Sequence, residues 1–280
     1  KVCLMKIVVY TMSGAGNIFS VIDNRKYKFS IKELEKYAPL ICGYNVSKPT
    51  EGLIALNEGD SVNDFIVYFF NPDGSYGAMC GNGARCAVKF AYSRGLITQE
   101  FATTFTMANS LYTATIEDNE VTVYFPDPLE IIQEKNIIVN GNTIIGGYIN
   151  VGSDHFVTEI NSHLFSEFPL VEFALPLRYH PDFLPRGVNV NIYTRQEDEV
   201  VYMRTYERGV EAETGACGTG AISTALYCAL THNIPSPIRL VPTSGQQLVV
   251  GFMNSNKGIT DVYLRGGAEI LDTFTMEIKQ

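Results

Sequence analysis

The sequence is short of positive charge. Its 280 residues contain 21 Lys and Arg against 30 Asp and Glu, which gives a formal net charge of −9 at pH 7. Binding to nucleic acid requires a surplus of basic side chains to neutralise phosphates, so this composition argues against a general nucleic-acid binder. The surplus of acidic residues is most simply explained by a solvated surface.

Long apolar runs are absent as well. No stretch approaches the roughly 20 apolar residues that a membrane-spanning helix needs, so no membrane partner is expected. The opening residues, KVCLMKIVVY, are shorter than a secretory signal and lead directly into motif-like sequence, which indicates a cytoplasmic location. With 46% hydrophobic residues, the chain is long enough to build a sizeable core in one large domain or two ordinary ones.

Patterns that indicate a metal or a cofactor are missing too. The four histidines are scattered, the six cysteines contain no C-x-x-C pair, and neither a P-loop nor a Rossmann fingerprint occurs. No lysine stands in a context that suggests a Schiff base. We therefore expect neither a metal nor a cofactor. Six cysteines are also too few for a disulfide scaffold in a chain of this length.

Two of the six cysteines stand in a repeated motif. Residues 80–84, CGNGA, and residues 217–221, CGTGA, share the pattern C-G-x-G-A, and an apolar helical pattern follows each. The two motifs lie 137 residues apart, close to half of the chain. The remaining four cysteines are expected to be small buried hydrophobic residues; these are Cys3, Cys42, Cys86 and Cys228.

The same offset connects three further pairs of positions, each where a β-type apolar run meets a small or polar loop. The pairs are Asn17 with Asp154, Gly52 with Asn189, and Asn71 with Arg208. We infer two homologous halves, residues 1–126 and residues 127–265, with a boundary at the FPDPLE turn. The pattern leaves open whether residues 266–280 cross back to the first half.

Short strands dominate the rest of the chain, and helices are few. Runs rich in β-branched and aromatic residues are bounded by turn residues, and the last two, residues 260–266 and 269–280, are predicted as separate strands. Residues 30–42 are predicted to form a helix that starts with a capping box, and residues 163–173 are a candidate short helix. Strand-rich halves that each wrap one prominent helix are an α+β arrangement.

A thiol at the start of a helix has distinctive chemistry. The first N–H groups of a helix are unpaired and its dipole is positive there, which lowers the pKa of the thiol. The neighbouring glycines expose N–H donors that can hold a carboxylate. If two such sites face each other, a thiolate can remove a proton beside the carboxylate while a thiol returns one from the opposite side. Cys80 and Cys217 are therefore predicted to be catalytic.

At these residues the sequence resembles the diaminopimelate epimerase family. MCGNGARC and ERGVEAETGACGTGA are similar to the two signature segments of that family, and the resemblance extends from SGAGNIF to TDVYLRGGAEI. It implies cofactor-independent epimerisation of L,L-2,6-diaminoheptanedioate to the meso form, in lysine and peptidoglycan synthesis, by a cytoplasmic enzyme that is often a homodimer. The implied fold is α+β, with two pseudo-symmetric domains. Each is a barrel-like, mostly antiparallel sheet around a central helix, and the active site lies in the cleft between them.

The resemblance also implies roles for individual residues. Cys80 and Cys217 match the catalytic pair, and His155 and Glu207 match a supporting pair. The positions that match substrate-binding residues are Asn17, Asn71, Gly81, Asn82, Ser153, Asn189, Glu207, Arg208, Gly218 and Thr219. Ser153 and Asp154 stand where the family commonly has Asn-Pro, so Ser153 is expected to make a substrate contact that is usually made by an amide.

Other functions stay open at this stage. A related two-thiol racemase would act on proline or histidine, but a proline-type enzyme usually has a His after its first C-G, where this chain has Asn82. A non-catalytic thiol or anion-binding module would bind a ligand without exchanging its α-hydrogen. An isomerase with a carboxylate base is disfavoured, because both motifs carry a cysteine.

Overall fold

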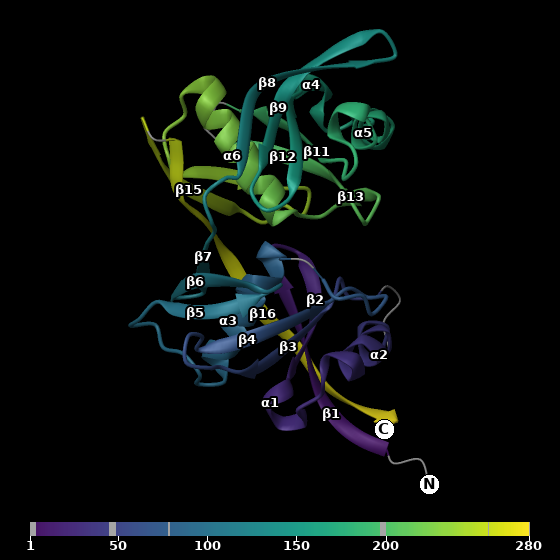
Figure 1. Ribbon diagram of the computed structural model, residues 1–280, viewed down its shortest axis with the longest axis vertical. Coiled ribbons are helices and arrows are strands. Elements are labelled where there is room, and N and C mark those ends of the chain that lie inside the picture. The colour runs from purple at the N-terminus through teal and green to yellow at the C-terminus, as the bar shows by residue number, and fades with distance from the viewer. Residues whose placement is uncertain (1–3, 45–48, 78, 197–199, 257, 280) are drawn as a thin grey trace. The chain divides into compact units, whose positions relative to one another are not determined.

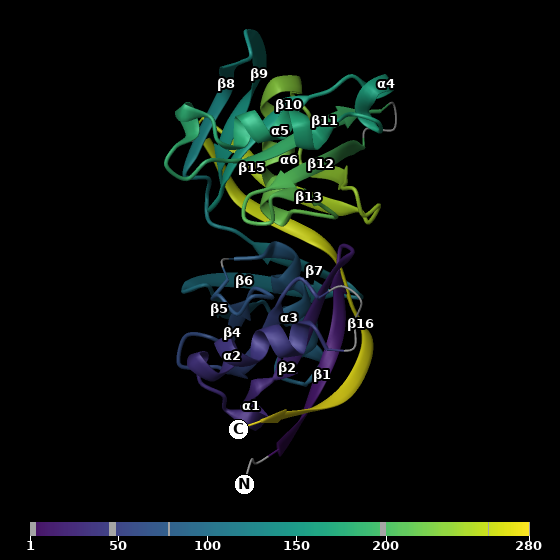
Figure 2. The same ribbon diagram turned by 90° about the vertical axis from the view of Figure 1, so that its right-hand side faces the viewer.

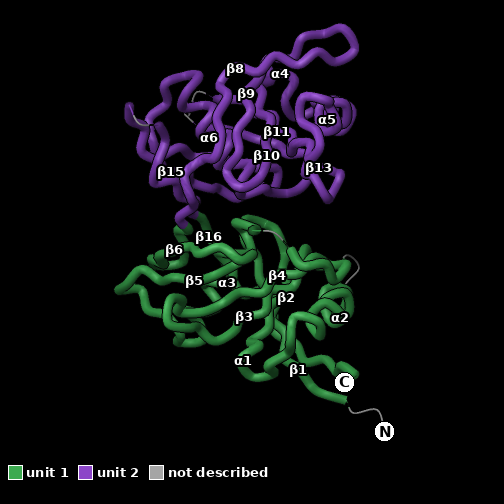
Figure 3. The backbone as a smooth tube through the Cα atoms, in the orientation of Figure 1, with its two compact units in different colours: residues 1–123, 266–280 green, residues 124–265 purple. Residues whose placement is uncertain are grey.

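The computed structural model describes residues 4–44, 49–77, 79–196, 200–256 and 258–279, so the expectation for Cys3 lies outside the described residues. The chain divides into two compact units, residues 1–123 with 266–280, and residues 124–265 (Figure 3). The first unit contains Cys80 and the second contains Cys217.

The first unit is a closed sheet (Figure 1). Strands β1 to β7 follow one another in chain order, and β16 pairs with both β7 and β1, which closes the sheet. Figure 2 shows the end of β16 running beside β1. The strands are β1 (Leu4–Gly14), β2 (Asn17–Asp23), β3 (Leu53–Glu58), β4 (Phe65–Phe70), β5 (Thr103–Met107), β6 (Ser110–Glu117), β7 (Glu120–Tyr124) and β16 (Gly258–Lys279).

Helix α3 (Gly81–Ser93) lies in the interior of this unit, packed against β1, β2 and β3. Its residues from Gly81 to Val88 are all buried. Gly14, at the end of β1, is required for the close approach, since a Cβ atom there would lie 2.6 Å from the Asn82 carbonyl oxygen. This contact fixes the start of α3, and with it Cys80, against the end of β1.

Helix α2 (Ile31–Cys42) covers the outer face of the sheet, and the short α1 (Asn24–Tyr27) precedes it. The predicted capping box is confirmed: Ser30 Oγ accepts from the Glu33 N–H, and the Glu33 carboxylate accepts from the Ser30 N–H. The apolar face of α2, which includes Leu34 and Ile41, packs on buried side chains of β1, β2 and β3. Burial of this apolar stripe holds the helix on the sheet.

The second unit has a sheet in the order β16, β15, β14, β12, β11, β10, β9, β8, with β13 beside β12. Helix α6 (Gly218–His232) is buried against this sheet, and α4 (Ser162–Phe165) and α5 (Leu170–Arg178) pack on its other side. The further strands are β8 (Glu130–Val139), β9 (Asn142–Asn150), β10 (Asp154–Glu159), β11 (Asn189–Arg195), β12 (Val201–Glu207), β13 (Ala212–Thr214), β14 (Ile238–Val241) and β15 (Leu248–Ser255).

The repeat found in the sequence is also present in the fold. β2 and β10 begin 137 residues apart, as do α3 and α6. The alternation of strand pairings repeats as well: β1–β2 and β9–β10 are antiparallel, β2–β3 and β10–β11 are parallel, and β3–β4 and β11–β12 are antiparallel. The predicted fold class, two pseudo-symmetric α+β domains with a sheet around a central helix, is confirmed.

Two strands, β8 and the second part of β16, lie at the ends of the two repeats. β8 comes after β7 in the chain but pairs with β9. In β16, residues 258–265 pair with β15, whereas residues 268–279 pair with β1. β8 and this second part of β16 are equivalent under the 137-residue offset. β8 therefore completes the sheet that contains β9, and the second part of β16 completes the sheet that contains β1.

Two expectations about individual elements are wrong. Residues 260–266 and 269–279 belong to the single long strand β16 rather than to two strands. Residues 163–173 do not form one helix, because α4 ends at Phe165 and α5 begins at Leu170. Pro169 stands between them, and a proline disfavours helical backbone in the residue before it, here Phe168.

Candidate functional site

Cys80 is the residue immediately before helix α3. Its backbone is extended (φ −118°, ψ 110°), and its Sγ accepts a hydrogen bond from the Gly83 N–H at 3.4 Å. This N–H is one of the donors that a helix leaves unpaired at its start, so the sulfur takes the place of a capping oxygen. The positive end of the helix dipole favours the thiolate form of such a side chain.

Cys217 occupies the equivalent position before helix α6, with nearly the same backbone (φ −116°, ψ 116°). The residue is 8% exposed, and its Sγ lies 3.6 Å from Thr219 Oγ1. A hydroxyl can donate a hydrogen bond to a thiolate sulfur, so Thr219 is placed to stabilise the charged form. The prediction that each motif cysteine precedes a helix is confirmed.

Asn82 and Arg85 fix the first turn of α3 behind Cys80. Both side chains are buried, and Arg85 is completely so. Arg85 Nη2 donates to Asn82 Oδ1 at 2.8 Å, and Nη1 donates to the Gly81 carbonyl at 3.4 Å. Burial lowers the pKa of Arg85 to about 10, so the guanidinium stays charged at neutral pH. The side-chain oxygen of Asn82, a predicted substrate-binding residue, is thus engaged by Arg85.

Asn17 and Asn71 lie at the ends of two strands in the same unit. Asn17 opens β2, pairs with Gly14 across the β1–β2 turn, and donates from Nδ2 to Glu51. Its Oδ1 is buried and has no hydrogen-bond partner within the described part of the chain. Asn71 follows β4, and its side chain donates within the next turn at 2.9 Å. Because Gly14 also packs on Asn82, Asn17 lies near the start of α3.

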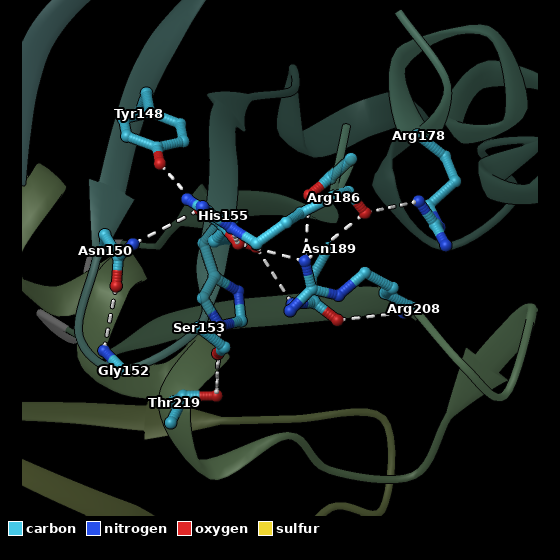
Figure 4. Close-up of polar contacts among 12 residues, drawn as sticks. Tyr148, Asn150, Gly152, Ser153, His155, Arg178, Arg186, Asn189, Arg208 and Thr219 are labelled. Atoms are coloured by element: carbon cyan, nitrogen blue, oxygen red, sulfur yellow. Dashed lines mark hydrogen bonds and ion pairs between the residues drawn. The ribbon is translucent and has the colours of Figure 1, made fainter. Parts of the chain in front are cut away.

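Ser153, His155 and Thr219 form a hydrogen-bonded triangle beside Cys217 in the second unit (Figure 4). Ser153 Oγ lies 2.8 Å from His155 Nε2, and Thr219 Oγ1 lies 3.0 Å from each of these atoms. Ser153 belongs to the loop before β10, His155 to β10, and Thr219 to the first turn of α6. The triangle connects the imidazole to the Cys217 sulfur through the Thr219 hydroxyl.

His155 is completely buried. Burial lowers its pKa to about 3, and the positive charge of Arg208 acts in the same direction, while the carboxylate of Asp154 opposes it. The imidazole is therefore neutral at physiological pH. It acts in the triangle through its hydrogen bonds and not through a charge.

The depressed pKa of His155 predicts a pH dependence of stability. Below its ordinary pKa of about 6.5 the unfolded chain binds a proton at this residue and the folded chain does not, so acidification favours unfolding. From pH 7 to pH 5 this difference is worth roughly 2 kcal/mol of unfolding free energy. Urea titrations at pH 7 and pH 5 measure the unfolding free energy that is lost on acidification. This loss should be larger, by the amount given, in the wild type than in His155→Gln. An equal loss in the two proteins would contradict the assignment.

A second cluster surrounds the carboxylate of Asp154, and Figure 4 labels its members Tyr148, Arg186 and Arg208. Arg186 donates from Nε to Oδ2 at 2.9 Å and from Nη2 to Oδ1 at 2.8 Å, and Arg208 Nη1 donates to Oδ2 at 2.9 Å. Although burial alone would raise the pKa of Asp154, hydrogen bonds from Arg186, Tyr148 and Arg208 hold it well below its usual value of 3.8. Two guanidinium groups share one carboxylate, so the cluster keeps a net positive charge.

Asn189 and Glu207 flank this cluster. Asn189, the first residue of β11, accepts on Oδ1 from the Arg208 N–H at 2.8 Å and donates from Nδ2 to the Asp154 carbonyl at 2.9 Å. Glu207 accepts from Thr214 Oγ1 at 2.8 Å, and burial raises the pKa of this carboxyl. Asn189 therefore holds the backbone at Arg208, and Thr214 holds the Glu207 carboxyl.

Residues of these networks that were missed in the sequence include Arg85, Asp154, Arg186 and Asn191, whose Nδ2 lies 3.0 Å from His155 Nδ1. Asp154 was available as the repeat equivalent of Asn17. Asn191 follows Asn189 by two residues in a strand, and this spacing places both side chains on one face. No sequence signal marks Arg186, which lies in the loop before β11.

The cysteines outside the two motifs behave as predicted where the structure describes them. Cys42, Cys86 and Cys228 are buried. Burial raises the pKa of Cys42 to about 11, and those of Cys86 and Cys228 to about 12. These thiols stay protonated at neutral pH and are unsuited to act as bases.

Membrane-spanning helices and metal-binding clusters are both absent from the described residues. Among them, no helix is long and apolar enough to span a membrane. Groups of three or more His, Cys, Asp or Glu side chains placed to hold a metal ion are also not found in that part of the chain.

Comparison with known proteins gives a consistent result. Residues 9–128 match the sequence profile of a family described as diaminopimelate epimerase. The diaminopimelate epimerase of Aquifex aeolicus is 34% identical over 267 residues, which cover 92% of this chain and 93% of the relative. The chain belongs to the diaminopimelate epimerase family. The diaminopimelate epimerase of Flavobacterium psychrophilum is 32% identical over 263 residues, or 94% of this chain and 97% of the relative.

Solved structures of more distant proteins share the fold of this diaminopimelate epimerase family member. A hydroxyproline epimerase from Agrobacterium vitis has a TM-score of 0.68 at 17% identity, with 98% of this chain and 93% of that chain covered. A phenazine biosynthesis protein of the PhzF family from Bacillus anthracis has a TM-score of 0.76 at 13% identity, with 98% and 100% covered. At these identities the likeness shows the fold alone.

Proposed function

We propose that this protein is an isomerase that converts L,L-2,6-diaminoheptanedioate to its meso form, without a cofactor, in lysine and peptidoglycan synthesis. The observation that carries the proposal is the equivalent placement of Cys80 and Cys217, each the residue before a buried helix. A helix start favours a thiolate and offers N–H donors to a carboxylate. Membership of the diaminopimelate epimerase family supports the same activity.

In the proposed mechanism one sulfur is a thiolate base and the other is a thiol acid. The thiolate takes the proton from the α-carbon, and the negative charge that develops on the adjacent carboxylate is stabilised by the N–H groups of Gly81, Asn82, Gly218 and Thr219. The thiol then gives its proton to the opposite face of the carbon, which inverts the centre. After turnover the two cysteines have exchanged protonation states, so the reverse reaction uses the same groups in opposite roles.

The cluster around Asp154 supports a substrate with a second carboxylate. Its net positive charge suits one further anion, and we assign the far carboxylate of the substrate to Arg208, with Asn71 and Asn189 at the same end. Glu207 and the unpartnered Oδ1 of Asn17 are acceptors for a substrate ammonium. Ser153, in the triangle with His155, takes the contact that an amide makes in relatives, and His155 and Glu207 support the thiols.

Turnover of three amino acids tests the proposed substrate. The reduced protein should epimerise L,L-diaminoheptanedioate, with exchange of its α-hydrogen for deuterium in D₂O, and should leave L-proline and L-histidine unchanged. Epimerisation of only proline or histidine would overturn the substrate assignment and favour a related racemase. Failure to exchange any α-hydrogen would favour a thiol or anion-binding module.

We further propose that the enzyme is a cytoplasmic homodimer. The described cysteines Cys42, Cys86 and Cys228 are free thiols, which is typical of a reducing compartment. The dimer is supported by the family resemblance, and sedimentation equilibrium is the measurement that decides it. A chain that sediments as a monomer while fully active would exclude this part of the proposal.

A further inference from the structure

Asn191 lies behind His155 and makes hydrogen bonds that fix the orientation of its own amide. The side chain is completely buried in β11. Its Nδ2 lies 3.0 Å from His155 Nδ1 and donates to the Phe156 carbonyl at 3.3 Å, and its Oδ1 accepts from Thr205 Oγ1 at 2.9 Å. A flipped amide would turn Oδ1 toward the carbonyl oxygen of Phe156, where no donor exists. The Nδ2 group therefore faces the imidazole.

This contact determines the tautomer of His155. An amide nitrogen only donates, so Nδ1 must accept, and the neutral imidazole carries its proton on Nε2. The Nε2–H then points at the hydroxyls of Ser153 and Thr219. Since Thr219 Oγ1 accepts from Ser153 and lies within reach of Nε2–H, the hydroxyl proton of Thr219 is left for the Cys217 sulfur at 3.6 Å.

We propose that Asn191 is a positioning residue for Cys217. By fixing the Nε2–H tautomer of His155, it directs the Thr219 hydroxyl to donate to the Cys217 sulfur and stabilises the thiolate. The inference rests on the proposed function only in giving Cys217 a catalytic role. The tautomer itself follows from hydrogen bonds within one unit of the chain.

Gly220, in the first turn of α6, leaves room for the Asn191 side chain. A Cβ atom at Gly220 would lie 2.6 Å from Asn191 Oδ1 and 3.2 Å from Thr205 Oγ1, so the bare glycine of the motif lets the strand amide approach the helix. The Cys80 unit has no equivalent network, because the repeat positions of His155 and Asn191 are Ile18 and Ile54. The orientation of the Thr219 hydroxyl by His155 is thus a feature of the Cys217 motif that the Cys80 motif does not share.

The charges around His155 stay in place when Asn191 is changed. Arg208 on the segment after β12 lowers the pKa of His155, and Asp154 on β10 raises it. Cys217 before α6 lies beside the triangle, and Tyr148 on β9 donates a hydrogen bond to Asp154. An effect of an Asn191 variant can therefore be assigned to the lost amide contact.

Nitrogen NMR of the histidine rings tests the tautomer directly. In ¹⁵N-histidine-labelled protein without substrate, the His155 ring, assigned by its loss in His155→Gln, should be protonated on Nε2 and unprotonated on Nδ1 between pH 6 and 8, across the ordinary histidine pKa of about 6.5. The near-isosteric Asn191→Asp places an acceptor at Nδ1, so its Nδ1 should become protonated. A wild-type ring protonated on Nδ1, or an unchanged ring in Asn191→Asp, overturns the proposal even if the enzyme is an active epimerase.

Alkylation of Cys217 tests the consequence for the thiol. Iodoacetamide labelling of the Cys217 peptide is followed against pH by mass spectrometry in a Cys80→Ala background, so that the two thiols cannot titrate as a pair. Loss of one hydrogen bond to a charged sulfur in Asn191→Leu should raise the midpoint by about one pH unit. Tyr193→Phe is the matched control, because it removes a partly buried hydrogen bond to His232 from the same strand and should leave the midpoint unchanged. Equal midpoints in Asn191→Leu and the wild type overturn the proposal. If the Leu variant does not fold, the NMR result decides.

Discussion

Cys80→Ala and Cys217→Ala should each lower the rate of epimerisation by about 10³- to 10⁴-fold, the size of effect expected when a positioned acid or base is removed. Inversion needs proton removal on one face of the α-carbon and proton delivery on the other, so neither sulfur can replace its partner. The measurement is kcat for L,L-diaminoheptanedioate, followed by solvent deuterium entering the α-position. The double variant should be no slower than the slower single variant, because the two groups act as a unit.

Cys86→Ala and Cys228→Ala are the matched controls for this loss. Cys86 lies in α3, the helix that begins after Cys80, and Cys228 lies in α6, the helix that begins after Cys217. Both thiols are buried, and burial raises the pKa of each. Each control should keep its activity within a few-fold of wild type and lose only packing energy. A single motif variant that turns over as fast as its control would refute the two-thiol mechanism.

A halogenated substrate separates the base from the acid. On a diaminoheptanedioate with a halogen on the β-carbon, removal of the α-proton is followed by loss of halide and formation of the Cα–Cβ double bond, and no proton has to be returned. A variant that keeps the base for that stereoisomer should still eliminate halide although it cannot epimerise. Halide release by one single variant and not by the other would assign each cysteine to one face of the substrate.

The parts of the fold that depend on local rules could be predicted from the sequence. The C-G-x-G-A motifs identified the two helix starts because glycine and a small polar cap precede apolar residues at helical spacing. The capping box at Ser30 and Glu33 is a signal confined to one turn. The offset of 137 residues predicted two similar halves, because equal spacing between several pairs of positions requires an internal repeat.

Contacts between distant segments could not be predicted in the same way. His155 meets Asn191 only because β10 and β11 are parallel neighbours in a register that places His155 opposite Asn189. A shift of one residue would put these side chains on the other face of the sheet, and the sequence does not specify the register. Arg186 reaches Asp154 across 32 residues from a loop without a pattern of its own. The supporting side chains of a site are therefore harder to find in a sequence than its motif residues.

Arg208→Met should lower kcat/KM for L,L-diaminoheptanedioate by about 10²- to 10³-fold. Removing one partner of a hydrogen-bonded charge pair typically costs 2–5 kcal/mol, and each 1.4 kcal/mol is about tenfold. The variant loses the donor assigned to the far carboxylate and leaves Asp154 to Arg186 alone. Since the Asn189 contact is made to the Arg208 backbone, the local chain path should be retained.

Arg195→Met provides the matched control for this effect. Arg195 pairs with Glu159 at 3.1 Å, and both side chains are 39% exposed, so their ion pair is worth at most about 1 kcal/mol. The control should keep kcat/KM near the wild-type value, which separates the loss of a substrate contact from the loss of any arginine on this unit. If Arg208→Met behaves like the control, the far carboxylate is bound elsewhere. The His155 ring should keep its Nε2 proton in Arg208→Met, because the amide of Asn191 is unaffected, so substrate recognition and thiol positioning can be separated in one variant.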